Sequence, residues 1–201
     1  MNRNEKPRAV CLHDTKLDKE YAQWIYDIKQ RFRNAQIKAA VKVNSEQLLF
    51  NWQLGRDLVV RKAEEKWGNG IVEQVSLDLQ AAFPEAKGFS ARNLWNMKKW
   101  YSFYTSYEDF GNAVNALSGQ MDISSLKLQQ VAAEIQETAS EEKLQQVVAE
   151  IPFPAIFGFI PWGHHIEIIT KCKDLHEALF YVKRTIEEEE YRISLSEKKD
   201  R

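Results

Sequence analysis

The chain has 201 residues, of which 44% are hydrophobic and 28% charged, a composition typical of a globular protein with one core or two small ones. Its formal net charge is −1, but residues 1–100 carry 18 Lys or Arg against 12 Asp or Glu, whereas residues 101–201 carry 10 against 17. The first half is therefore the better candidate for contact with a polyanion.

Several protein classes do not fit this composition. The two cysteines, Cys11 and Cys172, lie far apart and form no C-x-x-C motif, so neither a disulfide framework nor a zinc ribbon is indicated. No window approaches the roughly 20 apolar residues of a membrane helix, and the N-terminus lacks the apolar core of a signal peptide. We therefore expect a cytoplasmic protein with no membrane partner.

The first 60 residues contain a polar arm and then a long periodic segment. Residues 1–17 show no apolar periodicity and are predicted to be disordered. Apolar residues recur at three- and four-residue steps over residues 21–43, which predicts a long amphipathic helix. Asn44 and Ser45 compete for local backbone hydrogen bonds, so the apolar run at 48–59 either continues this helix or restarts it after a kink.

A second helix is predicted after the glycine-containing turn at residues 66–70. It should begin near Ile71 and end close to Phe83, because Pro84 disfavours a helical residue before it. Its apolar face is predicted to consist of Ile71, Val75, Leu79, Ala82 and Phe83.

The most informative segment is residues 87–104, which predict a helix that begins at Ala91. Ser90 is a suitable N-cap, and Phe89 before it can pack onto the first turn. At 100° per residue the predicted faces separate: Leu94, Met97, Tyr101 and Tyr104 lie on the inner one, and Arg92, Asn96, Lys99 and Phe103 on the outer one. With Lys87 and Lys98, this basic segment is a candidate phosphate-binding surface.

Helix, short turn and cationic helix together have the outline of a helix-turn-helix unit, in which the second helix enters the major groove of DNA. Two other interpretations remain open. Any antiparallel helix pair in a bundle shares this outline. The cationic face can also be an amphipathic helix surface that is only solvated.

The second half is predicted to form a smaller helical subdomain after a glycine-containing linker at residues 108–123. The motif KLQQVAAEI at 127–135 returns as KLQQVVAEI at 143–151, which predicts two short acidic helices. The apolar run IPFPAIFGFIPWG, from residue 151, is either part of the core or a binding surface.

Two helices are predicted after this apolar run. Trp162 should open one of them, and Asp174 should cap the last. The acidic residues Glu187–Glu190 are placed at the C-terminal end of that last helix. We expect fraying there, because acids oppose the helix dipole at that end.

No complete active site is recognisable. E-x-K triplets occur, but none follows the β-branched strand on which a metal-dependent nuclease site is built. His164, His165, Cys172 and His176 match no familiar zinc spacing. There is no glycine-rich phosphate loop or nucleophile elbow. We expect no metal, no cofactor and no catalysis in this chain.

Three sequence segments resemble a known family: AQIKAAVKVNSEQLLFNWQLGRDLV, WGNGIVEQVSLDLQAAFPEAKGFSARNLWNMKKWYSFY and IPWGHHIEIITKCKDLHEALFYVKRTIE. In this order they resemble the N-terminal domain of the YhcG-like nuclease family, over residues 21–188. In that family the helical N-terminal domain is thought to bind DNA, and a C-terminal domain of the PD-(D/E)xK type is thought to cut it. The resemblance implies a DNA-targeting role for residues 88–104.

The sequence departs from this family in two places. It ends in SEKKDR where the family continues through a Gly-Trp-Ser-Arg type of turn, so the nuclease domain is expected to be absent. The duplicated segment and the IPFPAIFGF insertion are also unusual for the family. The geometry between the two halves therefore does not follow from the resemblance.

The sequence predicts an all-α bundle with a helix-turn-helix-like pair in residues 18–107 and a second subdomain in residues 124–201. The expected partner is DNA, with a nuclease subunit or a second copy as further partners. The predicted DNA contacts are Lys87, Ser90, Arg92, Asn96, Lys98 and Lys99. The family resemblance implies a second candidate contact, at Trp162, His164 and His165. The alternative is a protein-interaction or oligomerisation module that uses an aromatic surface around Trp95, Trp100 and Phe103.

Overall fold

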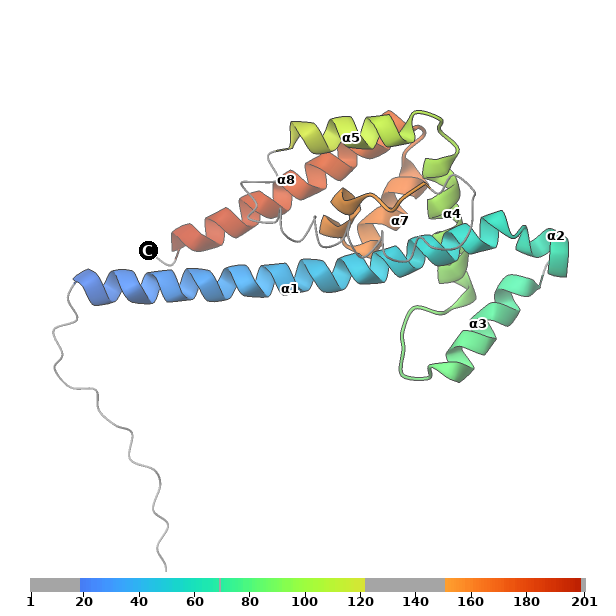
Figure 1. The fold of residues 1–201 in the computed structure, drawn as a ribbon, viewed down its shortest axis with the longest axis horizontal. Coiled ribbons are helices and arrows are strands. Elements are labelled where there is room, and N and C mark those ends of the chain that lie inside the picture. The colour runs from blue at the N-terminus through green and yellow to red at the C-terminus, as the bar shows by residue number, and fades with distance from the viewer. Residues whose placement is uncertain (1–18, 69, 122–150, 200–201) are drawn as a thin grey trace, which may run out of the picture. The chain divides into compact units, whose positions relative to one another are not determined.

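A computed structural model describes residues 19–68, 70–121 and 151–199, and these residues form helices without any strand, which confirms the all-α fold class. Figure 1 shows the elements in chain order: α1 Lys19–Val60, α2 Ala63–Trp67, α3 Ile71–Ala82, α4 Ala91–Thr105, α5 Phe110–Gln120, the 3-10 helix η1 Ala155–Phe159, α7 Trp162–Lys171 and α8 Leu175–Lys199. The predicted arm at 1–17 and all of the duplicated segment before Ile151 lie outside the described residues.

The chain divides into two compact units, residues 1–37 and residues 38–201. In the first unit the described part is a single element, the N-terminal half of α1. All other helices belong to the second unit, which also contains the core. Within the described residues, no helix combines the length and the apolar character needed to cross a membrane.

Helix α1 passes through Asn44 and Ser45 without a break, so the continuous helix is the correct alternative. The Asn44 side chain does not compete for its own helix backbone. It donates to the carbonyl oxygens of Gly158 at 2.8 Å and Ile160 at 3.0 Å, around the end of η1. Ser45 is buried, and a Cβ on Gly158 would collide with its side chain, so the glycine permits this close approach.

The core of the second unit is built around the indole of Trp52. Its ring lies 5.0 Å from Trp100, 4.9 Å from Tyr101 and 6.2 Å from Phe157, measured between centroids. The apolar run after residue 151 supplies Phe153, Ile156, Phe157 and Ile160 to this core, so it is core and not an exposed binding surface. Side chains from α1, α4, α5, α7 and α8 thus share one apolar centre.

Two sequence predictions about helix boundaries are wrong. The segment predicted as a linker contains α5, and Phe110, Val114 and Leu117 are buried because they recur on one helix face. Figure 1 shows α5 alongside α8. Helix α8 does not fray at Glu187, because the helix continues to Lys199 and Glu187 lies within it, near Lys183 at 3.9 Å.

A smaller cluster joins α1, α2, α3 and α4 through Leu58, Ala63, Val72 and Leu94. The short helix α2 overlaps the segment predicted as a turn only at Lys66 and Trp67. Of the two glycines in that segment, Gly68 has a positive φ, at 93°, whereas Gly70 has a φ of −90°. The buried residues of α3 are Val72 and Ser76, whereas Phe83 remains 55% exposed. Ile71, Val75 and Leu79 of the predicted apolar face pack against this cluster, which confirms that part of the face, whereas Ala82 and Phe83 are exposed.

Candidate nucleic-acid interface

Helix α4 begins where the sequence predicts. Ser90 is extended at φ −65° and ψ 146°, and its Oγ accepts from the backbone N–H of Asn93 at 3.3 Å. Phe89 packs against the cluster that contains Leu94, and its ring lies 5.9 Å from that of Phe50. The cationic helix therefore starts at a defined point of the chain.

A residue that the sequence analysis overlooked, Asn93, fixes this start further. Its side-chain amide donates to the carbonyl oxygen of Gly88 at 2.7 Å and accepts from the indole N–H of Trp162 at 2.8 Å. One side chain thus links the loop before α4, the first turn of α4 and the first turn of α7. A polar residue three positions after an N-cap was the signal that could have indicated this role.

The predicted inner face of α4 is confirmed, and the predicted outer face is confirmed in part, because Phe103 packs against the core. Leu94, Met97, Tyr101 and Tyr104 are buried, with exposed fractions between 0% and 6%. On the outer side Arg92 and Lys99 are exposed, while Asn96 and Phe103 are half-buried. The packed side holds the helix axis in place, and the side that faces solvent carries the cations.

The charges on this surface differ in their partners. Among the described residues, Arg92, Lys99 and the exposed Lys87 form no ion pair. Lys98 is different, because its ammonium group pairs with the Glu64 carboxylate on α2 and holds the pKa of that carboxyl below its usual value. Lys98 thus has a partner inside the fold, although the sequence analysis placed it among the phosphate contacts.

The connection between α3 and α4 is an ordered loop over residues 83–90, longer than the three or four residues typical of a helix-turn-helix. Two side chains of α3 hold it: Ser76 Oγ donates to the Phe89 carbonyl at 2.6 Å and Gln80 Nε2 donates to the same oxygen at 3.1 Å. Burial of the Ser76 hydroxyl therefore costs little free energy, because the hydroxyl is hydrogen-bonded.

The second candidate contact, at the start of α7, is largely corrected by the structure. His165 is fully buried, because with Ile168 and Ile169 it lies on the inner face of α7, so it cannot reach a ligand in solution. Trp162 is half-buried and uses its N–H on Asn93. Only His164 of this trio is exposed.

The aromatic surface of the alternative interpretation is also corrected. Trp100 has an exposed fraction of 0% and belongs to the core, with its ring 4.9 Å from His165. Trp95 is 38% exposed, donates to Glu73 at 3.3 Å and lies under the Lys98 ammonium at 5.1 Å. The three aromatic residues therefore do not form one exposed surface.

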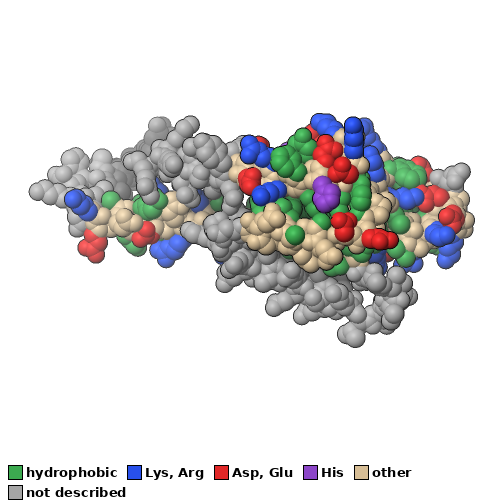
Figure 2. All heavy atoms as spheres, turned by 90° about the horizontal axis from the view of Figure 1, so that it is seen from above, with side chains coloured by type: hydrophobic (Ala, Val, Ile, Leu, Met, Phe, Trp, Pro, Cys, Tyr) green, Lys and Arg blue, Asp and Glu red, His purple; other side chains and the backbone are tan. Residues whose placement is uncertain are grey.

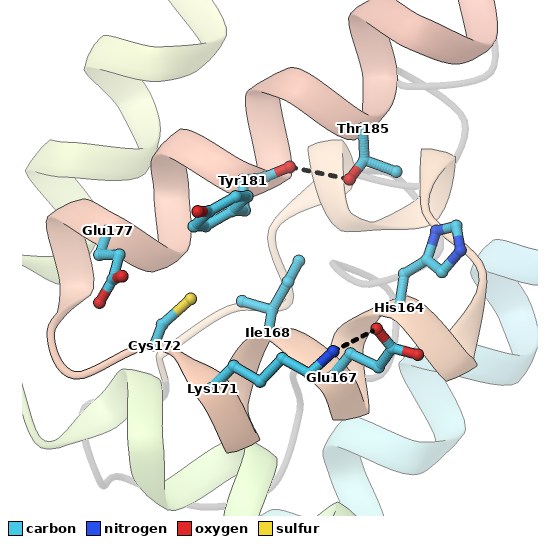
Figure 3. A pocket seen from close by; sticks show the side chains of 8 residues that line it. All are labelled: His164, Glu167, Ile168, Lys171, Cys172, Glu177, Tyr181 and Thr185. Atoms are coloured by element: carbon cyan, nitrogen blue, oxygen red, sulfur yellow. Dashed lines mark hydrogen bonds and ion pairs between the residues drawn. The ribbon is translucent and has the colours of Figure 1, made fainter.

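A groove of about 360 Å³ lies between α7 and α8, and His164, one of the expected DNA contacts, lies on its wall. Figure 3 shows His164, Glu167 and Lys171 along α7, with Tyr181 and Thr185 opposite them on α8. Lys171 is paired with Glu167 at 3.2 Å. Both signs of charge are thus present in this groove, which suits a polyanion poorly.

Cys172, at one end of this groove, has a thiol whose pKa is raised by burial and by the neighbouring Glu177 and Asp174. Such a thiol stays protonated and is a poor nucleophile. Within the residues that the structure describes, no three His, Cys, Asp or Glu side chains come together as metal ligands. On the face shown in Figure 2, acidic and basic side chains are interspersed around a histidine.

Comparison with known proteins gives one match. The family model of the DUF1016 N-terminal domain matches residues 27–136, which include the whole of α3, α4 and α5. Neither a curated protein nor a solved structure matches the chain.

Proposed function

Because the chain belongs to the DUF1016 N-terminal domain family, we propose that it is a DNA-binding domain that targets duplex DNA through the outer face of α4. This proposal follows the resemblance to YhcG-like nucleases, whose N-terminal part is thought to have this role. Binding is assigned to the described residues, and cleavage is not. A nuclease domain or subunit is the partner that such a targeting role implies.

One observation carries the proposal: Arg92 and Lys99 are exposed on one side of a helix whose opposite side is completely buried. Seven residues separate them, which corresponds to about 10 Å along the helix axis. Because the helix axis is held in place by its buried side, two cations at this spacing can each reach a different phosphate. Ordering each long side chain costs about 0.5–1.5 kcal/mol, which the phosphate contact has to exceed. Neither cation has a carboxylate partner among the described residues, so no internal ion pair has to be broken first.

The remaining groups of the surface have distinct roles in this proposal. Lys87, on the loop before the helix, and the Ser90-capped N-terminus of α4 position the helix on the phosphate backbone. Asn96 lies between Arg92 and Lys99 on the same face, and its amide can both donate to and accept from a base edge. Lys98 is left out of the contact set, because Glu64 already neutralises it.

A titration of fluorescein-labelled duplex DNA at two salt concentrations tests the proposal. Arg92→Ala with Lys99→Ala should weaken binding at low salt and reduce the slope of log K against log salt by about 2, one for each lost phosphate contact. The control is Lys62→Ala with Lys171→Ala, two exposed cations away from α4, the first in the turn before α2 and the second on α7, with exposed side-chain fractions of 70% and 74%. An equal loss in both double variants would refute a specific α4 surface.

Catalysis is tested in the same samples. Incubation of the duplex with the chain and Mg²⁺ should leave the DNA intact if the domain only binds. Cleavage that survives repeated purification would show that the assignment of binding alone is wrong. Full binding by the Arg92→Ala and Lys99→Ala double variant would instead remove α4 from the proposal.

A further inference from the structure

The loop before α4 is held by hydrogen bonds from two helices. Asn93 Nδ2, on α4, donates to the Gly88 carbonyl oxygen at 2.7 Å, and Ser76 Oγ, on α3, donates to the Phe89 carbonyl oxygen at 2.6 Å. Gly88 has a φ of 115°, a conformation that residues with a Cβ rarely adopt. Two consecutive carbonyl groups of this loop therefore have fixed donors, and the glycine permits the backbone to present them.

Lys87 lies between two fixed parts of this loop. On one side the Ala86 N–H donates to the Phe83 carbonyl oxygen at 3.0 Å and closes a turn. On the other side Asn93 holds the carbonyl group of Gly88. The backbone position of Lys87 is therefore set by its neighbours, while its side chain is exposed to solvent.

The side-chain amide of Asn93 satisfies its two partners in only one orientation. The Gly88 carbonyl oxygen can only accept, so the Nδ2 amino group must face it. The indole N–H of Trp162 can only donate, so Oδ1 must face it, at 2.8 Å. Trp162 is itself held, with its ring 5.0 Å from that of the buried Trp100. The start of α7 thus orients the side chain that holds the loop.

We propose that Asn93 is a positioning residue for DNA binding, which holds Lys87 where its ammonium group reaches a phosphate. This inference rests on the proposed function, in which Lys87 contacts the phosphate backbone. Both ends of the Asn93 amide are occupied, so Asn93 acts through Lys87 and not on the DNA itself. A lysine on a free loop has the same charge, but its backbone must be ordered on binding, and this loss of conformational entropy weakens the complex.

The cap of α4 does not depend on the Asn93 side chain. Ser90 Oγ accepts from the backbone N–H of Asn93 at 3.3 Å, and this bond remains when the side chain is replaced. The inner face of α4, with Leu94 and Met97, is buried independently of the loop. Loss of the Asn93 amide should therefore free the loop and leave α4 in place.

Three variants test this role in the titration of labelled duplex DNA. Asn93→Leu has a side chain of similar shape and removes both hydrogen bonds without a change of charge. Trp162→Phe keeps an aromatic ring and removes only the N–H. Asn44→Leu is the matched control, because Asn44 also bridges two backbone carbonyl groups, but at η1. Far-UV circular dichroism and urea unfolding show whether each variant folds and how much stability it loses.

Asn93→Leu should weaken DNA binding by about three- to tenfold, the factor expected for ordering one long side chain on binding. The slope of log K against log salt should stay unchanged, because no charge is lost, whereas Lys87→Ala should lower it by about 1. In the Lys87→Ala background Asn93→Leu should have no further effect, since both residues act through one contact. Trp162→Phe should weaken binding by a smaller factor, and Asn44→Leu should leave the affinity unchanged.

Limited digestion with trypsin tests the loop without DNA. Trypsin cuts after lysine, so it can cleave between Lys87 and Gly88 once the loop is free to enter the protease. Asn93→Leu should accelerate this cleavage by about tenfold or more, because two hydrogen bonds no longer hold the loop. Mass spectrometry of the fragments identifies the cleaved bond, and Asn44→Leu should leave its rate unchanged.

Two results would overturn the positioning role alone. One is DNA binding that Lys87→Ala weakens but Asn93→Leu leaves unchanged. The other is an effect of Asn93→Leu that persists in full in the Lys87→Ala background, which would give Asn93 a separate role. An unchanged rate of cleavage after Lys87 would show that Asn93 does not hold the loop. Absence of DNA binding by the unmodified chain would overturn the proposed function, and the positioning role with it.

Discussion

Acidification from pH 7 to pH 5 should destabilise this protein through one residue, His165. Its side chain is completely buried, and its Nε2–H donates to the carbonyl oxygen of Phe157 at 3.0 Å. Nδ1 has no hydrogen-bond partner among the described residues. Burial lowers the pKa of His165 to about 4, since a charged imidazole would lose its hydration there without gaining a counter-ion.

The size of the effect follows from linkage. The pKa is 6.5 without the perturbation and about 4 in the fold, so the folded state binds fewer protons than the unfolded state between these values. Stability from this group is therefore complete above pH 6.5 and lost as the pH falls. At 1.36 kcal/mol per pKa unit the full loss is about 3 kcal/mol below pH 4, and about 2 kcal/mol is already lost at pH 5.

Urea unfolding at pH 7 and pH 5 measures this contribution when it is compared with that of two variants. His165→Gln keeps a donor for Phe157 and removes the titration, so its free energy of unfolding should fall less between the two pH values than that of the unmodified chain. His164→Gln is the control, since His164 is adjacent and exposed. The change in unfolding free energy between the two pH values is compared between each variant and the unmodified chain. Carboxylates that titrate in this range contribute equally to both changes, so their contribution cancels.

The reasoning is refuted if His165→Gln and the unmodified chain lose the same free energy on acidification. An independent readout covers the case in which His165→Gln does not fold. In the unmodified chain the NMR signal of the buried imidazole should stay at its neutral position down to pH 5. An imidazole at position 165 that titrates near pH 6.5 would contradict the burial argument.

Three further substitutions probe the packing around α4, each by urea unfolding at pH 7. Gly55→Ala should destabilise by about 1–3 kcal/mol, because a Cβ there would collide with the backbone carbonyl of Met97, whereas Gly111→Ala has open space and should be neutral or stabilising. Ser90→Ala should cost about 1 kcal/mol through the lost N-cap, and destabilisation below the error of the method would contradict that cap. Lys98→Met should cost roughly 1 kcal/mol or more, since it leaves its partly buried carboxylate partner on α2 unpaired, and an unchanged midpoint would show the ion pair to be dispensable.

The residues next to the start of α4 were enough to predict where this helix begins. Ser90 and the four inner residues act within one or two helical turns of each other, so their identities and spacing predict the cap and the buried face. The same holds for Asp174, whose Oδ1 accepts from the N–H of Glu177 at 2.8 Å at the start of α8. The family resemblance also rests on short continuous segments of sequence, and the matching family model covers the segment around α4.

Distant packing decided the positions where prediction was wrong. Gly111 and Gly119 suggest a linker, but α5 forms because Phe110 and its periodic neighbours are buried against other helices. Trp100 and His165 have polar groups that suit a surface, yet they lie in the core, where their rings pack at a tilt against each other and against Phe157, with centroids 4.9 to 5.8 Å apart. The stability gained from such packing depends on contacts between helices far apart in the sequence, so the spacing of apolar residues within one helix does not predict it.

The sequence by itself determined the all-α class, the cationic helix and its cap, because these depend on residues within a few positions of each other along the chain. Only the tertiary structure decided which cations remain available. Lys98 forms an ion pair with Glu64, which lies 34 positions earlier in the chain, whereas Arg92 and Lys99 stay exposed. Pairing across such a separation follows from how α2 packs near α4, and no spacing rule along the chain contains that information.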